Sequence, residues 1–196
     1  MRFFLGITGA SGAPYAARIL EGLVAADCEV GVCASEAGVE VLATELYGEP
    51  KLPRDEVLAR FTEAGGDAVT VYDARDFSSP FASGSAPVDG YAICPCSMST
   101  VGTMATGAMA NLIHRAGSVA LKEDRKLVLV PRETPLSLLH LDGLTTLRRA
   151  GAVILFAAPG FYHQPESIDD LVDFVAGRAL VHLGLGASLV KAWGDE

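Results

Sequence analysis

The residues of this chain that could take part in chemistry begin at a turn of small residues. The turn, Gly9-Ala10-Ser11-Gly12, separates an apolar segment from a helical pattern. Its glycines fit neither the dinucleotide-binding pattern G-x-G-x-x-G nor the phosphate-binding pattern G-x-x-x-x-G-K-[ST]. Ser11 is placed either to cap the following helix or to contact a ligand.

Two further stretches place hydroxyl groups between an apolar segment and a helical one. They are Ser35 and the run Ser97-Met98-Ser99-Thr100. Each hydroxyl has helix capping as its simplest role. Hydroxyl and free backbone N–H groups at a helix start also bind anions. Three such starts after neighbouring strands therefore predict a ligand pocket.

A polar pair and a phenol lie in segments that proline holds rigid. Arg132 and Glu133 stand between Pro131 and Pro135, which favours a fixed loop over a solvated helix surface. Tyr162 lies in the stretch PGFYHQP and supplies a hydroxyl beside apolar residues. We expect both segments to follow strands, where ligands of open α/β sheets bind.

Residues 111–125 are dense in cations for a chain whose formal net charge is -9. Arg115 and Lys122 are seven residues apart and share one helix face, either toward a ligand or as a solvated stripe. Arg178 stands among apolar neighbours, which favours a buried partner or a ligand. The acidic total disfavours non-specific binding to nucleic acid or to an anionic membrane.

Cysteine spacing argues against a metal centre. None of the four cysteines forms C-x-x-C or lies at a metal-ligand interval from a histidine, so we expect no zinc site. Cys33 and Cys94 fall in apolar runs and are expected to be buried. The start of the chain is not a signal peptide pattern and no run is long enough to span a membrane, which predicts a cytoplasmic protein.

The elements that position these residues alternate between strand-length apolar runs and helical patterns. Such alternation is typical of an α/β fold with a parallel sheet between helices, and the length favours one domain over residues 1–196. Residues 78–87 read as a loop, either a solvated connection or a ligand lid. The strands are expected at residues 2–7, 29–34, 68–72, 90–94, 126–130 and 152–156, and the helices at 13–25, 36–46, 99–107, 112–121, 135–150 and 167–183.

Taken in order, several blocks make the chain recognisable. They are TGASGA, CPCSMST, NLIHRA, LVLVPRETPLS and PGFYHQPES. In this order and spacing the sequence resembles the UbiX-like flavin prenyltransferases, from about Phe4 to Trp193. The resemblance implies a three-layer, flavodoxin-like or Rossmann-like fold. It also implies transfer of a dimethylallyl group from dimethylallyl monophosphate to N5 and C6 of reduced FMN, without a metal.

The resemblance assigns roles to individual residues. Gly9, Ala10 and Ser11 match the loop against the flavin, and Ser35 matches the serine at the FMN phosphate. Arg115 matches a position associated with the flavin and the active site. Lys122, Tyr162 and Arg178 match the cradle for the prenyl phosphate, together with Arg132, which also contacts the flavin. Further flavin contacts match Ser97, Met98, Ser99 and Thr100.

The same resemblance identifies candidates for the chemistry. Ser11, Glu45 and Glu133 match groups that handle protons, and Lys122 and Tyr162 complete the catalytic set. Taken alone, Glu45 reads as a helix-surface residue. An aromatic face stabilises the allylic cation character of the prenyl group by about 0.5 to 2 kcal/mol, and Phe77, Tyr162 and Trp193 are the available rings. We expect the segment carrying Trp193 to close over a pocket.

The implied partners are a UbiD-type decarboxylase, which receives prenylated FMN, and other copies of the chain in a dodecamer. Three alternatives stay open. A flavin-dependent cysteine decarboxylase shares the fold but has an essential histidine in its N-terminal half, whereas His114 is the first histidine here. An FMN-binding electron carrier would not need cations for a second phosphate. An aromatic-acid decarboxylase would release carbon dioxide without a partner.

Overall fold

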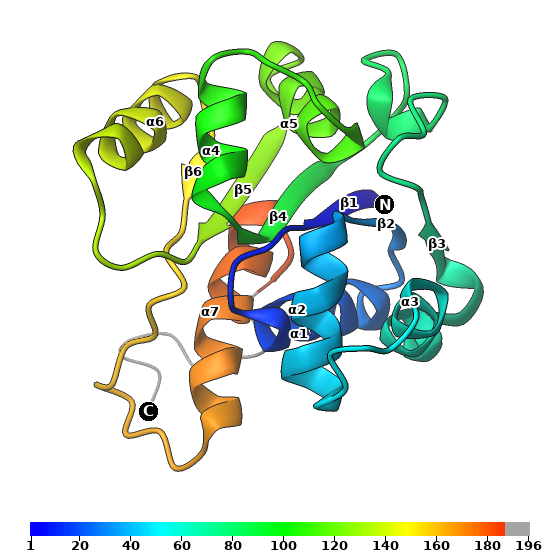
Figure 1. The fold of residues 1–196 in the computed structure, drawn as a ribbon, viewed down its shortest axis with the longest axis vertical. Coiled ribbons are helices and arrows are strands. Elements are labelled where there is room, and N and C mark those ends of the chain that lie inside the picture. Colours follow the sequence, from blue (N-terminus) through cyan, green and yellow to red (C-terminus); the bar gives the residue numbers. More distant parts are fainter. Residues whose placement is uncertain (187–196) are drawn as a thin grey trace.

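The computed structural model describes residues 1–186, which contain a six-stranded parallel sheet. The strand order is β3-β2-β1-β4-β5-β6, the order of a Rossmann fold, and it reverses between β1 and β4 (Figure 1). Ligands of such sheets bind at this reversal, beyond the carboxyl ends of the strands. The strands are β1 (Arg2–Ile7), β2 (Glu29–Ala34), β3 (Val69–Val71), β4 (Gly90–Cys96), β5 (Lys126–Pro131) and β6 (Val153–Ile154).

Helices cover both faces of the sheet and complete three layers, as predicted (Figure 1). The first layer holds α1 (Ala13–Ala25), α2 (Glu36–Tyr47), α3 (Arg54–Thr62) and α7 (Ile168–Leu183). The second holds α4 (Met98–Ala105), α5 (Leu112–Lys122), α6 (Leu138–Arg149) and the short 3-10 helix η2 (Pro80–Ala82). Another 3-10 helix, η1 (Glu63–Ala68), leads into β3.

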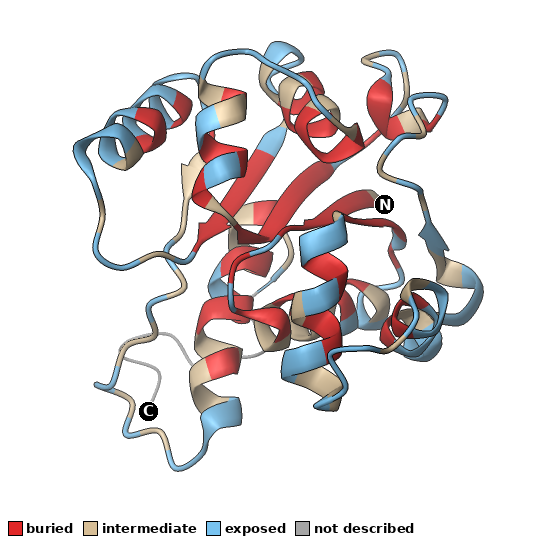
Figure 2. Ribbon diagram, in the orientation of Figure 1, coloured by how far each residue is buried: buried red, intermediate tan, exposed pale blue. Residues whose placement is uncertain are grey.

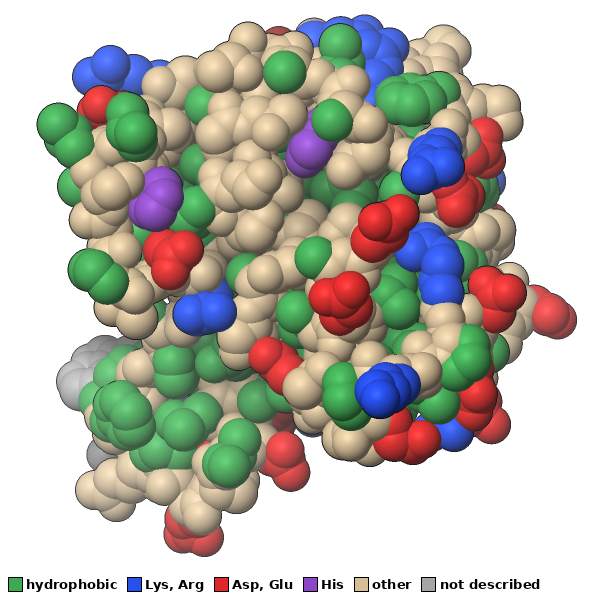
Figure 3. Space-filling view, viewed as in Figure 1, with side chains coloured by type: hydrophobic (Ala, Val, Ile, Leu, Met, Phe, Trp, Pro, Cys, Tyr) green, Lys and Arg blue, Asp and Glu red, His purple; other side chains and the backbone are tan. Residues whose placement is uncertain are grey.

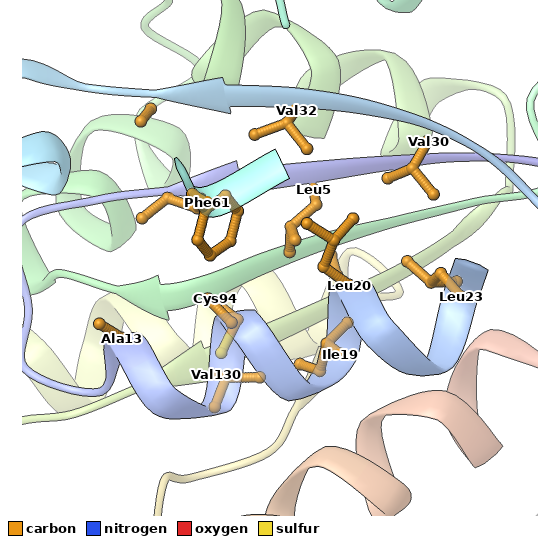
Figure 4. Packing of buried hydrophobic residues seen from close by; sticks show 14 of the residues in the cluster. Leu5, Ala13, Ile19, Leu20, Leu23, Val30, Val32, Phe61, Cys94 and Val130 are labelled. Atoms are coloured by element: carbon orange, nitrogen blue, oxygen red, sulfur yellow. The ribbon is translucent and has the colours of Figure 1, made fainter. Parts of the chain in front are cut away.

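The central strands are apolar because helices bury both of their faces. In β1, Phe3, Leu5 and Ile7 pack in the cluster under α1 and α7, whereas Phe4 packs in the cluster under α5. Figure 2 shows this continuous burial along the middle of the sheet. On the α1 side, Ile19 and Leu23 lie between the helix and the strands (Figure 4). Both of these side chains are fully buried.

Several predicted boundaries were wrong. Helix α3 and the two 3-10 helices were not predicted, and β6 is only Val153–Ile154 instead of residues 152–156. The predicted helix over 135–150 begins at Leu138, because Ser137 caps it and Pro135 lies before the helix. The loop expected at residues 78–87 contains η2, whose Phe81 is buried.

Some large apolar side chains lie on the surface. Leu138 and Leu139 on α6 are exposed, and so are Phe156, Phe161 and Ile168. Figure 3 shows hydrophobic side chains gathered over the segment that follows β6 and the start of α7, at the lower left. Among the described residues, none of the helices combines the length and apolar character that crossing a membrane requires.

Candidate active site

The loops that follow β1 and β4 are hydrogen-bonded to each other at the point where the strand order reverses. Thr8 Oγ1 donates to the carbonyl of Pro95 at 2.9 Å and accepts the N–H of Ser97 at 2.8 Å. The Thr8 N–H also donates to the Pro95 carbonyl, at 3.1 Å. Thr8 is buried, so these bonds are shielded from water and fix the two loops together.

The loop after β1 packs directly against the first turn of α2. A Cβ atom at Gly9 would lie 2.5 Å from the Cβ atom of Ala37, so a larger residue does not fit. The N–H of Ser35 donates to the carbonyl of Ile7 at 3.0 Å, which holds the end of β2 beside β1. We call the joined loops after β1, β2 and β4 the seam. Gly9 and Ser11 are exposed along the seam, whereas Ala10 is buried.

Glu45 caps helix α1 from the neighbouring helix. Its Oε2 atom accepts the N–H groups of Gly12 and Ala13, each at 2.8 Å. Gly12 holds the cap position without a side-chain hydrogen bond, so capping by Ser11 is wrong and contact with a ligand remains the interpretation for that serine. The carboxylate thus occupies the anion-binding start of α1, where a dinucleotide fold places a pyrophosphate.

The start of α2 is open by contrast. Ser35 Oγ accepts the N–H of Gly38 at 3.0 Å. Within residues 1–186, the N–H groups of Glu36 and Ala37 have no hydrogen-bond acceptor. The helix dipole and these two donors favour an anion at this position.

The four residues predicted at the start of α4, residues 97–100, differ in how far they are exposed. Ser97 is the helix cap, and its Oγ lies 3.1 Å from Thr100 Oγ1 and 3.3 Å from the Thr100 nitrogen. Met98 and Thr100 are buried. Ser99 is exposed and Ser97 is partly buried, so these two can contact a ligand directly.

The loop after β5 lies at the same, carboxyl, ends of the strands. Cys96 at the end of β4 pairs with Pro131 at the end of β5, which places Arg132 and Glu133 next to the loop that starts α4. Arg132 is exposed. Glu133 is partly buried, and its Oε1 accepts the N–H of Thr134 at 3.0 Å.

Two predicted phosphate ligands lie away from these strand ends. Lys122 ends α5 and forms an ion pair with Glu123. Because β5 begins at Lys126, the whole strand, about 17 Å, separates this end of α5 from Arg132. Arg178 is exposed, so the predicted buried partner is not observed within residues 1–186, and contact with a ligand stays a prediction. It lies on α7 toward Leu183, whose carbonyl accepts from Lys126 Nζ at 3.0 Å.

Three other predicted residues lie outside these strand-end loops. Arg115 is partly buried, and its Nε donates to the carbonyl of Ala82 at 2.9 Å. Phe77 is 51% exposed and Tyr162 is 58% exposed. The Tyr162 ring meets Phe174 edge-on at a centroid distance of 5.7 Å. Trp193 lies outside the described residues.

Sequence reasoning missed two polar side chains near these loops. Arg54 begins α3, and its Nη2 donates to the carbonyl of Ala34 at 3.1 Å. His163 stacks on Phe174 at a centroid distance of 5.3 Å, and both its ring nitrogens are buried without a partner among the described residues. A proline followed by a charged helix start was the available signal for Arg54, and PGFYHQP contained His163.

The cysteines are buried thiols, as predicted for Cys33 and Cys94. Burial raises the pKa of Cys33 to about 12, an effect that the positive charge of Arg54 partly opposes. Burial also raises the pKa of Cys96 to about 12. These thiols stay protonated at neutral pH, so they take no nucleophilic part at the sheet edge.

Comparisons with known proteins show the family and the fold of the chain. The Flavoprotein family model matches residues 1–180. A flavin prenyltransferase UbiX from Pseudomonas aeruginosa is 46% identical over 198 aligned residues, covering 100% of this chain and 95% of that protein.

Two solved structures share the fold over nearly the full length. AnUbiX (PadA1), in complex with FMN and dimethylallyl pyrophosphate, is 34% identical with a TM-score of 0.87 and covers 100% of this chain and 98% of that one. A dodecameric FMN-dependent UbiX-like decarboxylase from Escherichia coli O157:H7 is 36% identical with a TM-score of 0.86, covering 98% and 99%. By its identity to these full-length relatives, the chain belongs to the UbiX family of flavin prenyltransferases.

Proposed function

We infer that this chain is a flavin prenyltransferase that transfers a dimethylallyl group from dimethylallyl monophosphate to N5 and C6 of reduced FMN. The observation that carries this inference is the polar seam at the strand-order reversal, where the loops after β1, β2 and β4 are joined. The full-length similarity to flavin prenyltransferases supports it. A related structure that contains FMN and dimethylallyl pyrophosphate supports both ligand classes.

The residues at the seam fit FMN. The free N–H groups of Glu36 and Ala37, with Ser35 beside them, suit the phosphate of a mononucleotide. The closed start of α1 leaves Gly9 and Ser11 exposed for the flat ring instead of a second phosphate. When bound, reduced FMN supplies N5 and C6 as the atoms that accept the prenyl carbons.

Three side chains at the seam are proposed to move protons. Glu45 uses only Oε2 for the start of α1, which leaves Oε1 as the oxygen that accepts a proton. Ser11 is exposed beside the same turn and Glu133 approaches from β5. Because two backbone N–H groups fix the Glu45 carboxylate, its free oxygen is held in one place during the reaction.

Stabilisation of the departing phosphate is assigned to Arg132, Lys122, Tyr162 and Arg178, because cations and a phenol offset the growing negative charge. Lys122 lies at the opposite edge of the sheet from Arg132. We therefore propose that Lys122 and Arg178 act in the site of a neighbouring copy. The exposed Phe77 and the Trp193 segment remain the candidates for covering the prenyl chain.

Assembly of several copies is supported by surface features. Leu138 and Leu139, adjacent on α6, are 73% and 82% exposed, and grouped exposed apolar side chains mark interaction sites, whereas single ones do not. Phe161 is 71% exposed, and both ring nitrogens of His163, two residues later, have no hydrogen-bond partner among the described residues. A related structure is a dodecamer, and we propose the same assembly here.

The product partner and the location complete the proposal. Prenylated FMN is expected to pass to a UbiD-type decarboxylase. A cytoplasmic location is supported by four cysteines that are all free thiols within the described residues, since disulfides are rare in that compartment.

Anaerobic incubation with reduced FMN and dimethylallyl monophosphate, followed by mass spectrometry of the released flavin, tests the reaction. We expect the flavin to gain one C5H8 unit, and Arg132→Ala to reduce this gain strongly. An unchanged flavin together with tight FMN binding would favour an electron carrier. Carbon dioxide release from aromatic acids or cysteine peptides by the purified chain would favour a decarboxylase.

Mixed oligomers test whether Lys122 acts in a neighbouring copy. Lys122→Ala and Glu45→Gln are each expected to be slow, whereas oligomers that contain both variants recover activity, because some sites then hold both native residues. A mixture no faster than its two parents would place Lys122 and Glu45 in one chain's site.

A further inference from the structure

Arg54 occupies an unusual place for an arginine. It is the first residue of α3, it is partly buried, and its Nη2 donates to the carbonyl of Ala34 at 3.1 Å. Ala34 is the last residue of β2, and Ser35 follows as the cap of α2. The guanidinium therefore lies at the carboxyl end of β2, beside the open start of α2.

The charge of Arg54 has no acidic partner among the described residues. Some arginines of the chain do have one: Arg2 pairs with Glu29, Arg18 with Asp173 and Arg60 with Glu56. Arg54 contacts only a neutral carbonyl, which uses one of its five N–H donors. A partly buried cation with unused donors is suited to an anionic ligand.

The acidic side chain closest in sequence to Ser35 does not fill this role. Glu36 is exposed and its Oε1 lies 3.8 Å from Nη2 of Arg75. Both members of that pair are almost fully exposed, so the pair is weak. The end of β2 thus combines two free N–H groups, a hydroxyl and the Arg54 guanidinium.

We propose that Arg54 binds the phosphate of FMN together with Ser35 and the first turn of α2. This inference rests on the proposed function, because it concerns the same flavin. The start of α1 is closed by Glu45, whereas the start of α2 offers two free N–H groups to the phosphate. An arginine fork adds hydrogen bonds and full charge to a site that otherwise offers a helix dipole alone.

The test compares FMN with riboflavin, which lacks the phosphate. Dissociation constants of both flavins are measured by flavin fluorescence for the wild-type chain and for Arg54→Gln, which keeps an N–H donor for Ala34 but removes the charge. We expect FMN binding to weaken about 10- to 100-fold, since hydrogen bonds from charged groups contribute about 1.5 to 3 kcal/mol. Riboflavin binding should change less than about twofold.

Two further variants make the result specific. Arg54→Lys should recover part of the FMN affinity, because it restores the charge without the planar fork. Arg60→Ala is the matched control on the same helix, since its partners are Glu49 and Glu56, and both flavins should bind it as they bind the wild type. Circular dichroism confirms that each variant is folded.

Equal FMN affinity in the wild type and Arg54→Gln would overturn the inference and leave the proposed function intact. An equal loss of FMN and riboflavin affinity would also overturn it, because the effect would then not involve the phosphate. A wild-type chain that binds neither flavin would overturn both the proposed function and the role of Arg54.

Discussion

Replacing Glu45 with alanine tests whether a side chain of α2 stabilises the start of α1. The change removes an oxygen that accepts two backbone N–H groups at 2.8 Å and leaves both donors without a protein partner. Helix caps contribute about 0.5 to 2 kcal/mol, and hydrogen bonds to charged groups contribute more. Water reaches this exposed side chain, so we expect a loss of about 1 to 2 kcal/mol in the free energy of unfolding.

For a chain of this size, a loss of that magnitude lowers the melting temperature by about 2 to 8 °C. The assay is urea and thermal unfolding of the FMN-free protein at one fixed concentration, because assembly alters apparent stability. Glu40→Ala is the matched control, since Glu40 is exposed on the same helix and has no hydrogen-bond partner among the described residues. Glu45→Gln should lie between the two, because its amide oxygen still accepts. Equal stability of Glu45→Ala and Glu40→Ala would refute the reasoning.

Three further predictions concern other parts of the fold. Burial lowers the pKa of His114, so the unfolded chain binds more protons and the free energy of unfolding should fall as the pH drops below about 6.5. His114→Gln should flatten that slope, and parallel curves would contradict the assignment. The cysteines should resist a thiol reagent in the native protein and release four thiols per chain in urea, whereas fast native labelling would contradict their burial. Gly31→Ala should cost about 1 to 3 kcal/mol in urea unfolding, because its Cβ would lie 2.0 Å from the Phe81 ring, and Phe81→Leu should recover part of the loss.

The strands and most helices could be predicted because each follows from a local pattern. β1, β2 and β5 are buried on both faces, so their sequences are continuous apolar runs. Helix α3 escaped prediction because its sequence, RDEVLARFT, is short and mostly polar, with only Val57, Leu58 and Phe61 buried. Its existence depends on tertiary packing rather than on a periodic pattern.

In the candidate site, too, the parts that follow from local patterns could be predicted and the contacts between distant residues could not. Parallel strands end at one edge, so the hydroxyl-rich starts of α2 and α4 had to lie together. The Glu45 carboxylate reaches Gly12 across 33 residues of chain, and this contact depends on how α2 packs beside α1. Arg54 reaches Ala34 for the same kind of reason. No local spacing encodes such contacts. The place of Lys122, by contrast, follows from the pattern, because a helix over 112–121 that leads into a strand over 126–130 ends at the amino end of that strand.

These contacts explain why the glycine turn matches no phosphate-binding pattern. In a dinucleotide-binding fold the first helix keeps its N–H groups free for a pyrophosphate. Here the Rossmann strand order is retained, but a carboxylate occupies those N–H groups and would repel a second phosphate. The open helix start lies one strand outward, at Ser35, and an unpaired arginine stands beside it. Glu45 thus disfavours a phosphate at α1, and we propose that Arg54 favours one at α2, so that the dinucleotide-binding topology holds a mononucleotide. The comparison of FMN with riboflavin measures what the phosphate contributes to binding.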